Sequence, residues 1–201
     1  MIKQNNFFIK ISLLIFIFLF VSTTNANRLD HTKGTQLCSI ENYKYKNEYL
    51  YSLFGYQMDR RRIFINKIDR AYVKSVDQYA WIFEPVDWLN DTYYITNLQY
   101  NSYHLCAGHM FMDILNQRRY LTLNNLNEQS LKTNKKCMWR VKYDSTRNSY
   151  QIWNAYFKEA IYATKFILST LIQSTYRRNV FMWNGRPDSL QFDWKLICVK
   201  V

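Results

Sequence analysis

Three tryptophans, spaced 58 and 55 residues apart, constrain the fold of this chain more than any other feature. Each opens a short apolar run, and each unit also carries an Ile-x-Asn-x-x-aromatic motif. The repeated residues are Trp81, Trp139 and Trp194, with Ile40/Asn42/Tyr45, Ile95/Asn97/Tyr100 and Ile152/Asn154/Phe157. A pattern that returns three times at about 57 residues indicates three copies of one supersecondary unit.

A basic segment followed by an apolar residue also recurs once in each unit. Alignment on the anchors places together Arg60, Gln117 and Arg177, then Arg61, Arg118 and Arg178, then Phe64, Leu121 and Phe181. The stretches between landmarks are short, rich in aromatic and β-branched residues and bounded by polar ones, which is typical of strands. The segment from Ala160 to Ile172 has some helix-like spacing, but its β-branched content and its place in the repeat favour strand or loop.

Three units of about four strands each, with closing tryptophans and no helix pattern, predict an all-β β-trefoil. We expect about 12 strands, of which six form a short barrel and six form three capping hairpins. The domain would span residues 37–201, in units of approximately 37–91, 92–148 and 149–201, after a polar lead-in at 27–36. The repeated asparagines suit turns, because Asn tolerates left-handed backbone and its amide bonds nearby backbone groups. The predicted repeat core is Trp81, Trp139, Trp194, Ile40, Ile95 and Ile152.

Residues 1–26 have the layout of a secretory signal peptide. Lys3 and Lys10 precede an apolar run from Ile11 to Val21, and Thr24-Asn25-Ala26 gives a small-residue cleavage pattern. The run is short for a membrane-spanning helix, although an uncleaved anchor is the alternative. Cleavage removes two lysines and no acid, so the net charge falls from +12 to +10. We therefore expect a secreted, extracellular monomer without a membrane span. Its positive charge would either attract anionic partners or keep the protein soluble.

Four cysteines that enter an oxidising compartment predict two disulfides, with three possible pairings. In a trefoil, the first strand of a unit lies beside its fourth, which predicts the pair Cys106–Cys137 within unit two. The first and last strands of the chain close the barrel, which predicts the pair Cys38–Cys198. The three histidines lie in dissimilar contexts and form no Cys/His cluster with ligand spacing, so we expect no metal site.

Three segments resemble those of secreted arthropod β-trefoil proteins. They are Trp81-Ile82-Phe83-Glu84-Pro85, the strand from Tyr93 to Tyr100, and Asp59-Arg60-Arg61-Arg62-Ile63-Phe64. The chain is more distantly similar to the trefoil half of moth microvitellogenin-like haemolymph lipoproteins and to ricin-B-type lectins. The resemblance covers the whole mature chain and implies the fold. Ricin-type lectins carry Gln-x-Trp near the end of each unit, whereas this chain has Tyr79, Cys137 and Phe192 at the Gln position, so no sugar-binding residue is carried over.

No hydrolase, zinc-protease, P-loop or dinucleotide motif occurs, so we expect no enzymatic activity and no cofactor. Threefold symmetry could gather the basic segments at one end of the barrel, where arginine forks suit sulfate, phosphate or carboxylate. The alternative is that each arginine stacks on an aromatic ring or pairs with an acid. The candidate ligand-binding residues are Arg60, Arg61, Arg118, Arg119, Arg177 and Arg178. Asn90 heads a glycosylation sequon, which predicts a glycoprotein.

The sequence therefore predicts a secreted, non-enzymatic binding protein. Its partner would be carbohydrate or another anionic extracellular ligand, and a secreted location disfavours nucleic acid. The alternative is a salivary or venom-type effector, or a protease inhibitor, that acts on a host or target protein. The fold by itself does not decide between these functions.

Overall fold

The residues that the computed structural model describes form twelve strands, which confirms the predicted all-β class. The structure describes residues 29, 34–53, 61–67, 76–86, 89, 91–113, 116–170, 173–184 and 189–201. Side chains are described within these ranges except at 53, 61–62, 66–67, 76, 109–113, 116–117, 166–170 and 173–177. The predicted signal peptide, Arg60 and the sequon residue Asn90 lie outside the described residues.

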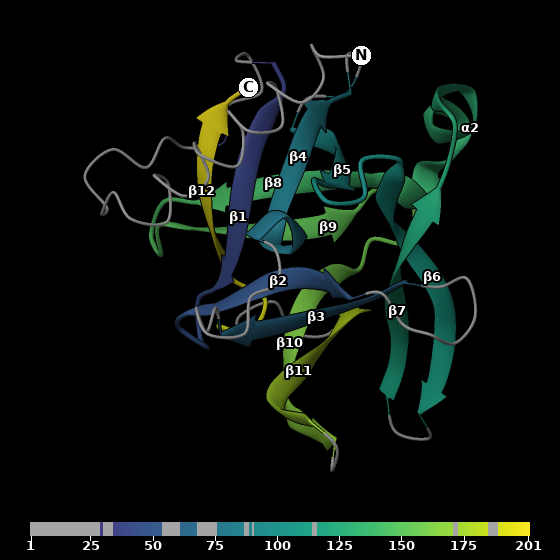
Figure 1. Ribbon diagram of the computed structural model, residues 1–201. Coiled ribbons are helices and arrows are strands. Elements are labelled where there is room, and N and C mark those ends of the chain that lie inside the picture. The colour runs from purple at the N-terminus through teal and green to yellow at the C-terminus, as the bar shows by residue number, and fades with distance from the viewer. Residues whose placement is uncertain are drawn as a thin grey trace, which may run out of the picture.

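Six strands close into a barrel. They are β1 (Gln36–Asn42), β4 (Ala80–Pro85), β5 (Thr92–Asn97), β8 (Met138–Asp144), β9 (Ser149–Asn154) and β12 (Trp194–Lys200). Antiparallel pairing runs β1–β4–β5–β8–β9–β12 and returns to β1, so none of these strands is left as a sheet edge. Figure 1 shows them in the upper part of the molecule.

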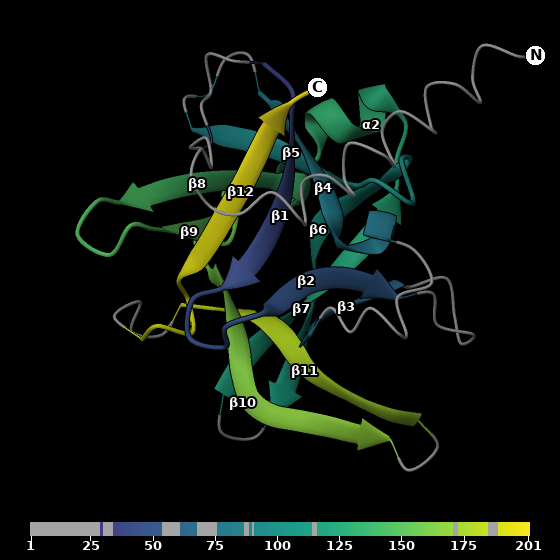
Figure 2. The same cartoon turned by 60° about the vertical axis from the view of Figure 1, so that its left-hand side comes forward.

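The other six strands form three hairpins that cap one end of the barrel. They are β2 (Glu48–Leu53) with β3 (Arg61–Lys67), β6 (Tyr103–Asp113) with β7 (Asn116–Asn125), and β10 (Ala160–Thr170) with β11 (Gln173–Trp183). Their second strands pair in a triangle, β3 with β7, β7 with β11 and β11 with β3. Figure 2 shows the long β10–β11 hairpin extending away from the barrel. The chain is thus a β-trefoil, and the segment from Ala160 is a strand, as predicted.

The three repeat tryptophans tie each barrel wall to the cap of its own unit. Their indole N–H groups donate to the carbonyl oxygens of Leu50, Leu105 and Ile161. The donors are Trp81, Trp139 and Trp194, at 2.9, 2.7 and 3.1 Å respectively. All three rings and the repeat isoleucines are fully buried. Because a buried N–H without an acceptor is destabilising, one bond in each unit fixes both ring and hairpin.

The amides of the repeated asparagines bond backbone groups of the turns, as expected, although none of the three residues has the left-handed backbone that asparagine tolerates. The Nδ2 of Asn42 donates to the carbonyls of Gln191 and Asp193, and its Oδ1 accepts from the backbone of the following turn. Asn154 makes the same bonds to Lys136 and Met138. The Nδ2 of Asn97 makes the equivalent pair of donations in unit two.

The strand register corrects the alignment of the basic segments in unit two by one residue. In the hairpin triangle, each equivalent arginine stands opposite the last core residue of a neighbouring strand. The pairs are Arg61 with Leu123, Arg119 with Met182, and Arg178 with Ile65. Arg119, not Arg118, is therefore the counterpart of Arg61 and Arg178. For the same reason Leu121 matches the core residues Ile63 and Val180, whereas Phe64 and Phe181 lie in outer clusters.

Short helices also interrupt the strand pattern, which the sequence did not predict. They are η2 (Val76–Tyr79), α2 (Glu128–Thr133) and η3 (Lys135–Cys137). Asn127 caps α2, because its side chain accepts from the backbone N–H of Ser130 at 2.8 Å. Six residues are too few to show a helical period, so α2 is visible in the sequence only through its cap.

Candidate functional site

Two of the candidate arginines form clamps between neighbouring units. Arg119 of unit two pairs with Glu159 of unit three through Nε–Oε2 at 3.0 Å, and its guanidinium lies 3.5 Å from the ring centre of Phe157. Arg178 of unit three pairs with Glu48 of unit one at 2.9 Å and lies 3.5 Å from the ring centre of Tyr45. Each guanidinium thus lies over a ring of the next unit and donates from its Nε and Nη2 to a carboxylate of the same unit.

Burial gives these two clamps a structural role. Arg119 is 8% exposed and Arg178 is 6% exposed, and Arg178 also donates to the carbonyls of Thr164 and Lys165. Burial raises the pKa of the Tyr45 hydroxyl despite the opposing charge of Arg178. The structure therefore places these arginines in inter-unit contacts rather than on an exposed anion-binding patch. Arg60 lies outside the described residues, and Arg61 and Arg177 are described only as backbone positions on β3 and β11.

On the outer side of the cap hairpins, one equivalent contact is made by a different pair of residues in each unit. In each unit, a hairpin residue contacts a residue that comes shortly before the repeat tryptophan. The hairpin residue directly follows the one whose carbonyl accepts the indole N–H bond, and its partner stands two positions before the tryptophan. In unit one these are Tyr51 and Tyr79, whose rings stack 5.1 Å apart, and in unit three they are Tyr162 and Phe192, at 5.2 Å. In unit two the same two positions hold the disulfide Cys106–Cys137.

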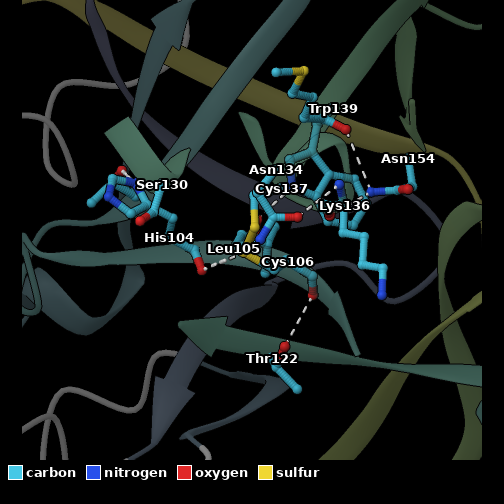
Figure 3. Close-up of a disulfide and its surroundings, with 12 residues drawn as sticks. His104, Leu105, Cys106, Thr122, Ser130, Asn134, Lys136, Cys137, Trp139 and Asn154 are labelled. Atoms are coloured by element: carbon cyan, nitrogen blue, oxygen red, sulfur yellow. Dashed lines mark hydrogen bonds between the residues drawn. A yellow bond between two sulfur atoms is a disulfide. The ribbon is translucent and has the colours of Figure 1, made fainter. Parts of the chain in front are cut away.

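Figure 3 shows this disulfide between β6 and η3, beside the Trp139 anchor. Thr122 donates to the Cys106 carbonyl at 3.4 Å and occupies the place of the phenylalanine in the other units. The second disulfide, Cys38–Cys198, joins β1 to β12 across the barrel seam. Both pairs are those that the sequence predicted. The described part of the chain has no free cysteine.

Unit three extends its stacked pair into a larger surface, which we call the unit-three aromatic face. Its members contact one another in series: Tyr120 with Phe181 at 5.2 Å, Phe181 with Tyr162 at 6.3 Å, and Phe192 with Trp183 at 6.1 Å. Trp153 packs against the same cluster. The face therefore consists of Tyr120, Trp153, Tyr162, Phe181, Trp183 and Phe192. Tyr120 is 42% exposed, and both tryptophans are partly exposed, so ring surface reaches solvent.

The two tryptophans of this face are departures from the repeat. Trp183 follows the core residue Met182, and its counterparts in the other units are Asn66 and Asn124. Trp153 follows the repeat isoleucine Ile152, and its counterparts are Glu41 and Thr96. Because the other two units fold with small or polar residues at these positions, the trefoil does not require tryptophan there.

A polar network fixes the Trp153 ring. Its indole N–H donates to Gln151 Oε1 at 3.2 Å, and Gln151 Nε2 donates to Asp193 Oδ1 at 3.2 Å. Asp193 is fully buried and is held in turn by Arg147 at 2.8 Å. A ring positioned in this way loses little conformational entropy when a ligand stacks on it.

Cations border the aromatic face on two sides. The Arg118 guanidinium lies 5.7 Å from the Tyr162 ring centre and 5.8 Å from that of Phe181. On β8, Lys142 Nζ lies 5.1 Å from the Trp153 ring, and Arg140 stands directly across from Trp153. Arg140 and Lys142 are exposed, and neither is paired with a carboxylate of the described residues. Of the sequence-predicted arginines whose side chains are described, Arg118 is thus the one that lies beside this face in a partly exposed position.

Sequence reasoning missed Trp153, Trp183, Arg140 and Lys142. It assigned aromatic residues to the core by default, and it searched for cations that recur in all three units. The available signal was the opposite one, a tryptophan in one unit where the other two have polar residues.

The described residues give no sign of a metal centre or a membrane helix. They hold no group of three or more His, Cys, Asp or Glu side chains that could bind a metal ion. Nor does any helix among them have the length and apolarity needed to cross a bilayer.

The chain matches no protein-family model, and no curated protein matches it by sequence. Solved structures match it by fold. The designed threefold-symmetric protein ThreeFoil has a TM-score of 0.58 at 11% identity, over 80% of this chain and 97% of its own. A salivary protein of the Cysteine and Tryptophan-Rich family from Culex quiquefasciatus has a TM-score of 0.58 at 13% identity, over 88% of this chain and 99% of its own.

A Polyporus squamosus lectin, solved with the epitope Neu5Aca2-6Galb1-4GlcNAc, has a TM-score of 0.56 at 12% identity. The match covers 81% of this chain and 49% of the lectin chain. Chains of enzymes are also among the matches. At these identities the likeness establishes the β-trefoil fold and nothing finer.

Proposed function

We propose that this protein is a secreted, non-enzymatic binding protein for carbohydrate, and that the unit-three aromatic face is its binding site. The observation that carries the proposal is the pair Trp153 and Trp183, which unit three adds where the fold needs no aromatic residue. Both are partly exposed and pack against the same buried cluster of rings. A lectin among the fold neighbours is consistent with this assignment.

The chemistry of the face suits a sugar ring. An aromatic face carries negative charge density, which attracts the C–H groups on one side of a pyranose, and a few fixed polar groups set the orientation of a ligand. Arg140 and Lys142 on the same wall supply donors for hydroxyl or acidic groups. The acid joined to the face, Asp193, is buried and paired with Arg147, so its charge is balanced and does not repel such a group.

A glycan array with the secreted chain tests the proposal. We expect binding that falls about tenfold in Trp153→Leu and in Trp183→Leu, since one aromatic contact contributes about 0.5–1.5 kcal/mol. Tyr49→Leu is the matched control, because Tyr49 is a half-buried aromatic packed on the equivalent cluster of unit one. Binding that survives both tryptophan changes would remove the site from this face. A wild-type chain that binds no glycan would overturn the function itself.

A second candidate function is that of a secreted effector, of salivary or venom type or a protease inhibitor, acting on a protein target. The mosquito salivary protein of the same fold supports it, as does the resemblance to secreted arthropod trefoils and microvitellogenin-like lipoproteins. On this alternative the array stays blank, and the tryptophan variants lose capture of a protein from host plasma.

A further inference from the structure

The turn between β9 and β10 keeps a lysine in an unfavourable backbone conformation. Lys158 has φ 58°, in the left-handed region that side chains with a Cβ rarely adopt. Its counterpart in unit one, just before the clamp glutamate, is Asn47 at φ 64°. Asparagine is among the residues that adopt this region most easily, so the backbone strain at this position is smaller in unit one. A strained residue that the repeat does not require is a reason to look for a function.

The turn is locked against a second lysine-bearing segment. Asn154 Nδ2 donates to the Lys136 carbonyl at 2.8 Å, and Asn154 Oδ1 accepts from the backbone of Tyr156 and Phe157. Figure 3 shows Asn154 bonded beside Lys136, with the lysine side chain extending away from the disulfide. The 3-10 helix η3 and the turn are thereby held as one rigid surface, which carries Lys135, Lys136, Tyr156 and Lys158. We call this surface the lysine patch.

The charge of the patch is unbalanced. Lys135, Lys136 and Lys158 are all exposed, and none of them pairs with an acid of the described residues. Glu159 follows Lys158 directly, but it is buried and neutralised by Arg119. The clamp therefore removes Glu159, which directly follows Lys158, from competition for the lysines of the patch.

An exposed ring lies on the same turn as Lys158. Tyr156 is 56% exposed and meets Phe157 edge to face at 4.7 Å. Lys136 Nζ lies 5.9 Å from the Phe157 ring centre, and Arg119 lies over the same ring. An exposed ring on the same surface as three lysines suits a ligand that combines a sugar face with several anionic substituents.

We infer that the lysine patch binds the sulfate groups of an acidic polysaccharide, with Tyr156 against a sugar ring and Lys135, Lys136 and Lys158 on the sulfates. This site is separate from the unit-three aromatic face and does not rest on the function proposed for it. The elements that form it are η3 and the β9–β10 turn, at the boundary of units two and three.

Heparin-affinity chromatography with matched variants tests this inference. We expect Lys158→Asn to elute at lower salt and to melt about 1–4 °C higher, because asparagine relieves the backbone strain while it removes a charge. Lys135→Gln with Lys136→Gln should reduce the slope of log affinity against log salt by about two. Lys46→Gln removes one exposed lysine from the equivalent turn of unit one and should elute close to the wild type.

Several outcomes would overturn the inference. One is elution of the Lys158→Asn and Lys135/Lys136 variants at the wild-type salt concentration, and another is equal retention on desulfated heparin. Tighter binding to vesicles of phosphatidylserine than to heparin would assign the patch to a membrane surface instead. Loss of heparin binding in the Trp153→Leu and Trp183→Leu variants alone would move the anionic ligand to the aromatic face. Normal heparin binding in those variants separates this inference from the proposed carbohydrate site.

Discussion

The clamp between units two and three gives a sharp prediction, because removal of its carboxylate leaves a buried charge without a partner. In Glu159→Gln the guanidinium of Arg119 stays buried, since the side chains of the pair are only 10% and 11% exposed. Removal of one partner of a buried ion pair costs about 3–5 kcal/mol. The stack on Phe157 and the hydrogen bond to the Gly108 carbonyl at 3.4 Å remain, so we expect about 3 kcal/mol.

That loss should lower the melting temperature by about 6–12 °C for a domain of this size. Circular dichroism during urea and thermal unfolding measures it. Two controls isolate the cause. Glu128→Gln breaks the exposed pair with Lys132 and should melt with the wild type, and Arg119→Met with Glu159→Met should recover most of the lost stability, because it removes both charges. A Glu159→Gln variant within about 1 kcal/mol of wild type, or a double variant as unstable as the single one, would refute the reasoning.

Three further predictions test the same framework. In unit two, Tyr103 occupies the position that Glu48 and Glu159 hold in the other units. Tyr103→Glu should therefore be more stable with Arg61 present than in an Arg61→Gln background. The expected coupling free energy in a double-mutant cycle is about 1 kcal/mol. Replacement of Cys38 and Cys198 by alanine should lower the free energy of unfolding by about 5 kcal/mol, because this disulfide closes a sequence separation of 160. The same change at Cys106 and Cys137, with a separation of 31, should cost about 4 kcal/mol, and urea unfolding measures both losses. Burial lowers the pKa of His104, which forms a hydrogen bond with Thr96 at 2.8 Å. The unfolded chain therefore binds a proton at His104 more readily than the folded chain does. The free energy of unfolding should fall as the pH drops below about 6.5, and it should fall less in His104→Gln.

The repeat made the fold predictable. The tryptophans and the Ile-x-Asn motif recur because every unit needs one buried N–H bonded to its cap and one amide that closes its turn, and both needs show in residue type. Both disulfide pairs were predicted correctly, although Cys106 lies on β6, the second strand of unit two, and not on its first strand as the prediction assumed. Here the local sequence and the global fold point to the same answer.

The arginines could not be placed from the sequence for two physical reasons. A strand alternates faces with a period of two, so the one-residue shift in unit two exchanged Arg119, which faces inward, for Arg118, which faces outward. The partner acids also lie far away in the sequence, since Arg178 and Glu48 are 130 residues apart. Only the assembled trefoil brings Arg119 and Arg178 each to the ring and carboxylate of the next unit.

The three units serve as internal controls for one another. Stacked tyrosines, a disulfide and a Tyr–Phe stack occupy one equivalent position, so the trefoil does not require one particular pair there. A residue that only one unit has, and that adds exposed ring or charge rather than core volume, is therefore not explained by the fold. Trp153 and Trp183 meet this criterion on the aromatic face, and Lys158 meets it on the lysine patch with added backbone strain. The pair Arg119–Glu159 joins two units and also keeps the Glu159 carboxylate from pairing with the lysines of the patch. The stability of the trefoil and the proposed binding by the lysine patch therefore depend on the same contact.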